Sequence, residues 1–278
     1  MTVQPPPRQF LATGFRDVDT SGDTDACHRC LDLIAGIPFF NQVKQDSIRI
    51  IADAAPERVL DAGCGAGIDL AALALTLPEP STIIGLDASA ALLGRAAVRM
   101  AACSDRCRLV KGDILHMPFR DGAFGACRID RVLQHIHTPE KAIGELTRAL
   151  APGGILVAFD NDWDTFRISL DDRDLAELIR RSWCDSFASG RIGHDLPQIF
   201  RANGLSEVHA EPRTLVLDDL ALAEPVFDLP HLLERMRLAG ELAPDQVAMI
   251  KTEFVQRARE GRFSLSYTGY LVVGRKPE

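Results

Sequence analysis

Acidic residues and glycines occur in this sequence at a spacing that suits a nucleotide-type cofactor. The segment VLDAGCGAG contains an apolar run that ends at Asp61 and is followed by Gly63, Gly65 and Gly67. Glycines at alternate positions let the backbone turn tightly and approach a ligand closely. Asp87 ends the next apolar run, 20 residues after the last of these glycines. A carboxylate at that position can accept both hydroxyls of a ribose.

Two cofactors suit a glycine loop that is paired with a ribose-binding acid. A dinucleotide fingerprint needs G-x-G-x-x-G, and its third glycine would fall at Ile68. Asp61 would also lie unfavourably beside a pyrophosphate, whereas the ammonium and sulfonium groups of S-adenosylmethionine favour an acid there. The residues therefore favour S-adenosylmethionine over NAD.

Length and charge restrict the class of protein. The 278 residues are 46% hydrophobic and 25% charged, with a net charge of −8, so we expect one large or two smaller globular domains. The negative charge gives no reason to expect nucleic acid or an anionic membrane as a partner. No apolar run is long enough to span a membrane, and the first residues do not resemble a secretory signal. Seven cysteines, an odd number, favour reduced thiols and a cytoplasmic protein.

The elements that must position the glycine loop follow from the hydrophobic pattern. After Pro56, short β-branched runs alternate with Ala- and Leu-rich stretches at intervals of about 25 residues. This alternation predicts a parallel, doubly wound α/β sheet. The expected strands are 58–62, 82–86, 108–111, 124–129 and 155–159, and the expected helices are 69–77, 89–102 and 140–150.

The flanking regions complete a division into three parts. Residues 1–55 are expected to form an arm and two lid helices that are separated at Pro38, and residues 56–160 form the cofactor-binding core. Residues 161–278 are expected to supply the rest of the sheet. In that part we predict helices at 171–187 and 196–203, strands at 206–217 and 263–273, and a helical insert at about 218–262. Such an insert would cap the carboxyl edge of the sheet, where ligands bind.

Four motifs follow one another between residues 38 and 160: VLDAGCGAG, IIGLDAS, GDILHMPFRDGAF and LAPGGILVAFD. With these motifs in this order, the sequence resembles the class I S-adenosylmethionine-dependent methyltransferases. Among them it resembles the ubiquinone- and menaquinone-methyltransferase-like branch, which acts on small molecules. The resemblance implies a Rossmann-like sheet of seven strands with an antiparallel last strand. It also implies S-adenosylmethionine as the cofactor, S-adenosylhomocysteine as the product and no metal.

The resemblance also implies roles for individual residues. The glycine loop and the acid before it would lie along the methionine and ribose of the cofactor. The residues at the ends of the second and third strands would contact the ribose and the adenine. The end of the fourth strand would face the methionine tail. In chain order these residues are Asp61, Gly63, Gly65, Asp87, Ala88, Asp113, Ile114, Asp130 and Arg131.

Methyl transfer is an in-line displacement, so alignment and desolvation can supply much of the catalysis. His135, just after the fourth strand, is the candidate general base, and the alternative is that it only packs or caps a helix. The acids at 160, 162 and 164 are interpreted as solvated loop residues and not as metal ligands. The acceptor wall is assigned to Phe39, Phe40, Trp163, Phe166, His194 and Met236. Ordinary packing is the alternative for Phe39, Phe40 and Met236, and a loop or helix-cap role is the alternative for His194.

The expected function is transfer of a methyl group to a small acceptor, either a natural product or a quinone- or lipid-like molecule. The alternatives are a protein that binds S-adenosylmethionine for cyclisation or regulation, and an arsenite methyltransferase that uses thiolates. The thiols available for the latter are Cys27, Cys30, Cys127 and Cys184. By analogy, a homodimer is expected. The sequence identifies neither the acceptor nor the atom that receives the methyl group.

Overall fold

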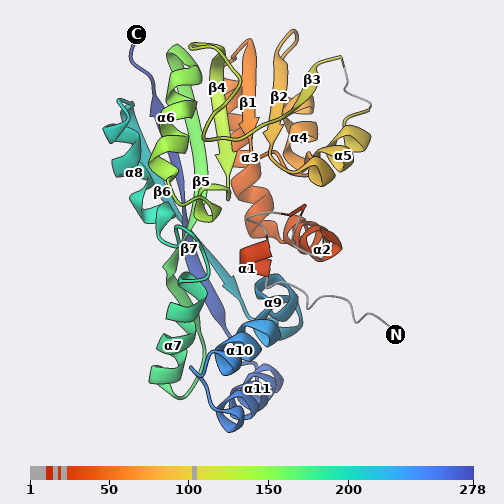
Figure 1. Cartoon of the computed structure of the whole chain (residues 1–278), viewed down its shortest axis with the longest axis vertical. Coiled ribbons are helices and arrows are strands. Elements are labelled where there is room, and N and C mark those ends of the chain that lie inside the picture. The colour runs from red at the N-terminus through yellow and green to blue at the C-terminus, as the bar shows by residue number, and fades with distance from the viewer. Residues whose placement is uncertain (1–10, 15–17, 20–23, 102–104) are drawn as a thin grey trace.

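A seven-stranded sheet forms the centre of the computed structural model, which describes residues 11–14, 18–19, 24–101 and 105–278, without the side chains of 11–12 and 24–28. The strand order is β3-β2-β1-β4-β5-β7-β6 (Figure 1). The first five strands pair in parallel, and β7 is antiparallel to both of its neighbours. The predicted fold class is therefore confirmed. The strands are β1 Arg58–Ala62, β2 Thr82–Asp87, β3 Cys107–Lys111, β4 Phe124–Asp130, β5 Leu150–Ile168, β6 Ser206–Leu217 and β7 Leu265–Arg275.

Helices cover both faces of this sheet. Val59 and Leu60 are both fully buried although they point to opposite faces, as expected of a central parallel strand. Val59 packs in a cluster with residues of α3 and α4, and Leu60 packs in another with residues of α6 and α8. The helical elements are α1 Leu11–Gly14, α2 Thr24–Ala35, α3 Pro38–Asp53, α4 Ile68–Thr76, α5 Ala90–Arg99, the 3-10 turn η2 Leu133–His135, α6 Pro139–Ala149, α7 Arg173–Cys184, α8 Ile192–Ala202, α9 Leu220–Phe227, α10 Leu229–Leu238 and α11 Pro244–Arg259.

The strand β5 is much longer than the sequence predicts. It continues to Ile168, and β7 pairs with it in register from Asp160↔Tyr270 to Asp162↔Thr268. Asp160 and Asp162 are consequently buried, with exposed fractions of 0% and 6%. The interpretation of these two acids as solvated loop residues is therefore wrong, because the partner strand and the helices around it cover them.

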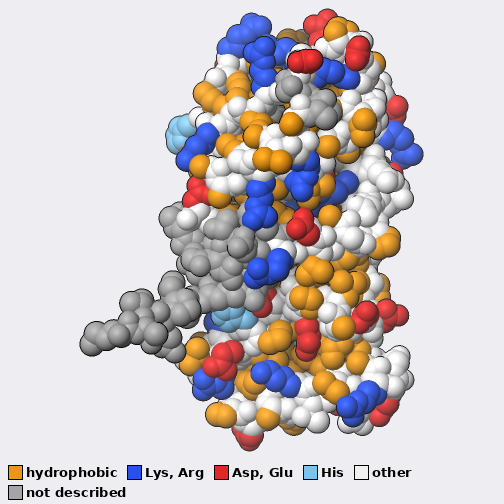
Figure 2. Space-filling view, turned by 90° about the vertical axis from the view of Figure 1, so that its right-hand side faces the viewer, with side chains coloured by type: hydrophobic (Ala, Val, Ile, Leu, Met, Phe, Trp, Pro, Cys, Tyr) orange, Lys and Arg blue, Asp and Glu red, His pale blue; other side chains and the backbone are white. Residues whose placement is uncertain are grey.

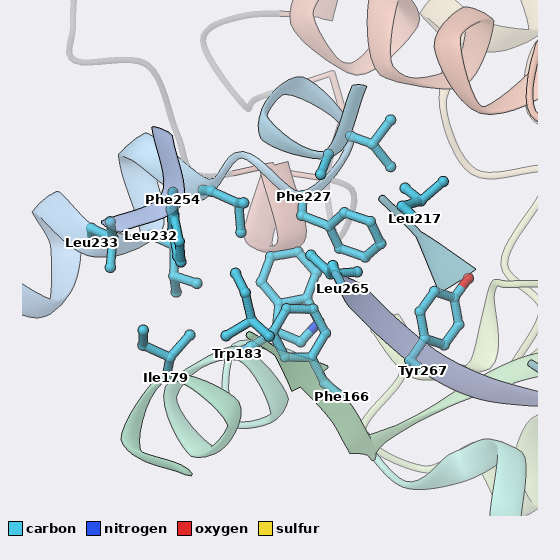
Figure 3. Packing of buried hydrophobic residues seen from close by; sticks show 14 of the residues in the cluster. Phe166, Ile179, Trp183, Leu217, Phe227, Leu232, Leu233, Phe254, Leu265 and Tyr267 are labelled. Atoms are coloured by element: carbon cyan, nitrogen blue, oxygen red, sulfur yellow. The ribbon is translucent and has the colours of Figure 1, made fainter. Parts of the chain in front are cut away.

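The extensions of β5, β7 and β6 carry a second core in the lower half of the molecule (Figure 1). There, α7 and the three late helices α9, α10 and α11 enclose a cluster rich in aromatic residues, which includes Phe166, Trp183, Phe227 and Tyr267 (Figure 3). The N-terminal helix α2 contacts α9, and the Cys30 thiol lies 3.9 Å from the carbonyl oxygen of Val226. The early and the late helices thus meet on one side of the sheet.

The surface carries basic, acidic and apolar side chains on the same face, and apolar groups are most frequent on its lower half (Figure 2). Among the described residues, no helix combines the length and the apolar character needed to cross a bilayer.

Candidate functional site

A cavity of about 630 Å³ lies at the carboxyl ends of β1, β2 and β4. This is the edge at which open α/β sheets bind ligands, because the loops that follow the strands leave a crevice there. All but one of the residues that the sequence assigns to the cofactor line this cavity. They are Gly63, Gly65, Asp87, Ala88, Asp113, Ile114, Asp130 and Arg131.

The glycine loop and the carboxylate of Asp87 are joined by a hydrogen bond. The backbone N–H of Gly65 donates to Oδ2 of Asp87 at 2.8 Å, and the N–H of Ser89 donates to Oδ1 at 2.9 Å. Burial raises the pKa of the Asp87 carboxyl group, and these N–H groups oppose the rise. Gly63 and Gly65 both have positive φ angles, of 72° and 53°. A Cβ atom at Gly63 would lie 2.3 Å from the Val132 side chain, whereas one at Gly65 would meet nothing within 4 Å. The open space at Gly65 is therefore available to a ligand.

Asp61 is the residue that does not line the cavity. Its carboxylate accepts a hydrogen bond of 2.9 Å from Arg128, whose side chain is 2% exposed. The same guanidinium lies 3.0 Å from Asp69 and 2.6 Å from Asp130, and donates to the Ser47 hydroxyl at 3.0 Å. Burial raises the pKa of Asp61 to about 6, against the opposing effect of Arg128. Asp61 thus belongs to a buried charge cluster, and its direct contact with the cofactor stays a prediction.

The cluster continues to the cavity wall through Asp130 and Arg131. The Nε of Arg131 donates to Asp130 at 2.8 Å, and its guanidinium carbon lies 4.7 Å from the centre of the Phe40 ring. Burial alone would raise the pKa of Asp130, but Arg131, Arg128 and Lys44 together hold that pKa well below its usual range. Arg131 also has a φ of 55°, a backbone conformation that costs free energy in a residue with a side chain and is often found at functional sites.

A smaller cavity of about 70 Å³ adjoins the large one, and we call it the aromatic chamber. The two share Ile34, Arg131, Gln134 and His135, so these four residues form the junction between them. Most of the remaining chamber wall is aromatic. The lining residues beyond the junction are Cys30, Phe40, Asn161, Trp163, Trp183, Phe187, Val226, Phe227 and Tyr267.

The side chain of Gln134 organises the junction. Its Oε1 accepts hydrogen bonds from Asn161 at 3.0 Å and from the Trp163 indole at 2.8 Å. The amide nitrogen therefore faces His135 and lies 3.1 Å from its Nε2, which must act as the acceptor. Because the lone pair of Nε2 is already engaged, His135 would have to break this hydrogen bond to serve as a base. Its role as a general base stays a prediction.

The residues assigned to the acceptor wall separate into two groups. Phe40 and Trp163 line the aromatic chamber. The other four line neither cavity: Phe39, Phe166 and Met236 pack in or against the cluster formed with the late helices, and His194 is exposed near the start of α8.

Several residues of the site were not assigned from the sequence. Arg128 had a detectable signal, because a charged residue inside an expected buried strand requires partners of opposite charge. Asp19 had none: its carboxylate accepts hydrogen bonds from the Ser89 hydroxyl and from the N–H groups of Ala90 and Ala91, so it caps α5 at the edge of the large cavity. The hydrogen bond from Ser89 is the largest cause of a lowered pKa at Asp19.

The cysteines do not converge in the part of the chain that the structure describes. Cys30 lines the aromatic chamber, Cys127 is buried on β4 and Cys184 lies on α7. The side chain of Cys27 is outside the described residues. The described residues contain no group of three or more His, Cys, Asp or Glu side chains with a metal-binding arrangement.

A family model described as a methyltransferase domain matches residues 60–158, which contain β1, the glycine loop, Asp87 and Asp130. The resemblance to the class I S-adenosylmethionine-dependent methyltransferases is thereby confirmed for the core of the chain, residues 60–158. The chain is 33% identical over 225 residues to an uncharacterized 37.1 kDa protein in transposon TN4556 of Streptomyces fradiae, and the match covers 80% of the chain and 64% of that protein. It is 34% identical over 117 residues to demethylmenaquinone methyltransferase of Thermus thermophilus, covering 42% of the chain and 53% of that enzyme.

Among solved structures, the fold of the chain is similar to that of phosphoethanolamine N-methyltransferase 2 of Haemonchus contortus, with a TM-score of 0.56. The identity is 18%, and the match covers 97% of this chain and 61% of that one. The chain thus spans about half to two thirds of the proteins it matches here.

Two glycine variants should separate folding from ligand binding. Gly63→Ala is expected to lower the free energy of unfolding by about 1–3 kcal/mol, because its Cβ would clash with Val132. Gly65→Ala should lower the free energy of unfolding by roughly 1 kcal/mol, because residue 65 has a positive φ. The same variant should weaken S-adenosylhomocysteine binding by more than about tenfold, since its Cβ would project into open cavity space. Thermal unfolding and calorimetric titration measure the two effects. Unchanged affinity of Gly65→Ala would contradict the placement of the ligand.

Arg128→Met is expected to destabilise the protein by about 3–5 kcal/mol, because it leaves buried carboxylates without their cation. The matched control is Arg262→Met, whose ion pair with Glu260 is exposed and should contribute only about 0–1 kcal/mol. Urea denaturation of both variants gives the comparison. A similarly small loss of unfolding free energy in the two variants would show that the buried charge cluster is not important for stability.

The buried acid at the end of the parallel part of β5 should make stability depend on pH. Burial raises the pKa of Asp160 from 3.8 to about 7, against hydrogen bonds from the N–H groups of Asn161 and Gln134. Between about pH 4 and pH 7 the folded protein holds a proton that the unfolded chain releases, so raising the pH favours unfolding. As the pH rises through this range, the free energy of unfolding of Asp160→Asn should increase by up to about 4 kcal/mol relative to that of the wild type. Denaturation of both proteins at a series of pH values tests this, and a constant difference between them would contradict it.

Proposed function

We propose that this protein transfers a methyl group from S-adenosylmethionine to a small-molecule acceptor. The observation that carries the proposal is the junction between the two cavities. The large cavity contains the glycine loop and the acids expected for the cofactor, and it meets a chamber with aromatic walls at Ile34, Arg131, Gln134 and His135. A donor in one cavity and an acceptor in the other would meet at these residues.

The described residues suit this cofactor. The backbone at Gly65 leaves open space beside the Asp87 carboxylate, which can bind ribose hydroxyls. At the other end of the site, Asp130 stays ionised well below neutral pH and lines the cavity, so it can attract the ammonium group of the methionine tail. Asp113 and Ile114 would contact the adenine. When bound, the cofactor supplies an electrophilic methyl group on a positively charged sulfur.

The chain contributes positioning and desolvation to this reaction. Gln134 holds the Trp163 indole and the His135 ring through hydrogen bonds, so the junction has a defined shape. The helices α2 and α9 bring Ile34 and Val226 to the chamber wall, where they help to exclude water. Exclusion of water and alignment of the reacting groups are the main requirements of an in-line displacement.

Calorimetric titration with S-adenosylhomocysteine and, separately, with NADH tests the cofactor assignment. We expect binding of the former alone, and we expect Asp87→Asn to weaken it by about 10- to 100-fold, the range for a hydrogen bond to a charged group. Asp105→Asn, an exposed position outside the cavity, is the control and should bind as wild type does. Transfer of a labelled methyl group to candidate acceptors then tests catalysis. Tight NADH binding, or methyl transfer undiminished in Asp87→Asn, would contradict the proposal.

A further inference from the structure

Two polar atoms in the aromatic chamber have no hydrogen-bond partner among the residues that the structure describes. The Oδ1 of Asn161 is buried and accepts no hydrogen bond. The Tyr267 side chain is 1% exposed and lines the chamber, and none of the hydrogen bonds found among the described residues involves its hydroxyl. Buried polar groups are nearly always paired, so unpaired ones at a cavity indicate that a ligand or water completes them.

The topology places both atoms on one side of the sheet. Asn161 of β5 pairs with Gly269 of β7, and Tyr267 is two residues from that glycine. Side chains two residues apart point to the same face of a strand, which puts Asn161 and Trp163 on the side of Tyr267. The rings of Trp163 and Tyr267 are in fact 4.4 Å apart between centres. Figure 3 shows the Tyr267 hydroxyl directed away from the packed rings of Phe166 and Trp183.

The charges around the chamber favour an uncharged ligand. Among the described residues, Arg131 is the one charged residue that lines the chamber, and its guanidinium is already paired with Asp130. No described carboxylate lines the chamber, so a bound cation would lack a counter-ion. Burial raises the pKa of Tyr267 above its usual value, and hence the phenol keeps its proton and can donate it in a hydrogen bond.

We propose that the chamber recognises an uncharged acceptor through a hydroxyl group, which accepts a hydrogen bond from Tyr267 and donates one to Oδ1 of Asn161. A hydroxyl is the smallest organic group that offers both functions. The apolar part of the acceptor would contact Trp163 and Phe187, whose rings stack with centres 5.0 Å apart. This inference rests on the proposed function, because it describes the acceptor of that same methyl transfer.

The volume of the chamber limits how the acceptor binds. About 70 Å³ is room for only a few heavy atoms, whereas a cavity of roughly 150 Å³ is known to bind one benzene ring. The acceptor must therefore also use the part of the large cavity that adjoins the junction. The chamber is large enough to recognise one terminal hydroxyl group while the rest of the acceptor lies in the large cavity.

A set of probes with one fluorinated ring tests the inference: 4-fluorophenol, 4-fluoroanisole, fluorobenzene and 4-fluoro-N,N,N-trimethylanilinium. Each is titrated in the presence of saturating S-adenosylhomocysteine and followed by fluorine NMR. Tryptophan fluorescence reports the location of binding, because both tryptophans of the chain line the chamber. We expect 4-fluorophenol to bind about 3- to 10-fold more tightly than the two neutral probes without a hydroxyl, as for one or two hydrogen bonds.

The two tyrosines of the chain provide a matched pair of variants. Tyr267→Phe should remove the preference for 4-fluorophenol with little change in fluorobenzene binding. Tyr270→Phe, on the same strand but beside His194 and outside the chamber, should retain the preference. Any of four results would overturn the inference. Three concern the wild type: equal binding of the neutral probes, stronger binding of the cationic probe, or no binding of any probe. The fourth is an unchanged preference for 4-fluorophenol in Tyr267→Phe. A protein that fails to bind S-adenosylhomocysteine would instead overturn the proposed function, and the probe titration without cofactor would still decide the chamber's preference.

Discussion

The site depends on one buried cation. The Arg128 guanidinium, on the central strand β4, contacts carboxylates from β1, from α4 and from the end of its own strand. A buried guanidinium is tolerated only where such partners surround it, and the partners in turn tolerate burial only because of the guanidinium. This mutual requirement holds the ends of β1 and β4 together below the glycine loop. Together with Arg131 and Lys44, the Arg128 guanidinium also holds the pKa of Asp130 well below its usual range, so this carboxylate is ionised at the cavity wall.

The two cavities differ in chemistry because different parts of the chain build them. The large cavity is formed mainly by loops after parallel strands, which supply backbone N–H groups and carboxylates. The aromatic chamber is formed by the extensions of β5 and β7 with helices from both ends of the chain. Gln134 stands between them and bonds to groups on both sides.

Much of the fold could be predicted from local pattern. Parallel strands are buried on both faces and appear as continuous apolar runs, so β1 and β2 were found to within one residue. The extension of β5 was missed because Asp160, Asn161 and Asp162 suggest a loop. Their burial depends on β7, which lies about a hundred residues later in the chain, and no local signal reports such a partner.

The sequence alone determined the glycine loop, the position of Asp87 at the end of the second strand and the order of elements that brings them to one edge of the sheet. These features depend on backbone conformation and hydrophobic periodicity, which are local properties. Only the tertiary structure decided that Asp61 pairs with Arg128, that Gln134 occupies the His135 nitrogen, and that Phe166 and Met236 pack away from the cavities. Those outcomes depend on which distant side chains share a buried space, because a charge or polar atom there must find its partner wherever the folded chain supplies one.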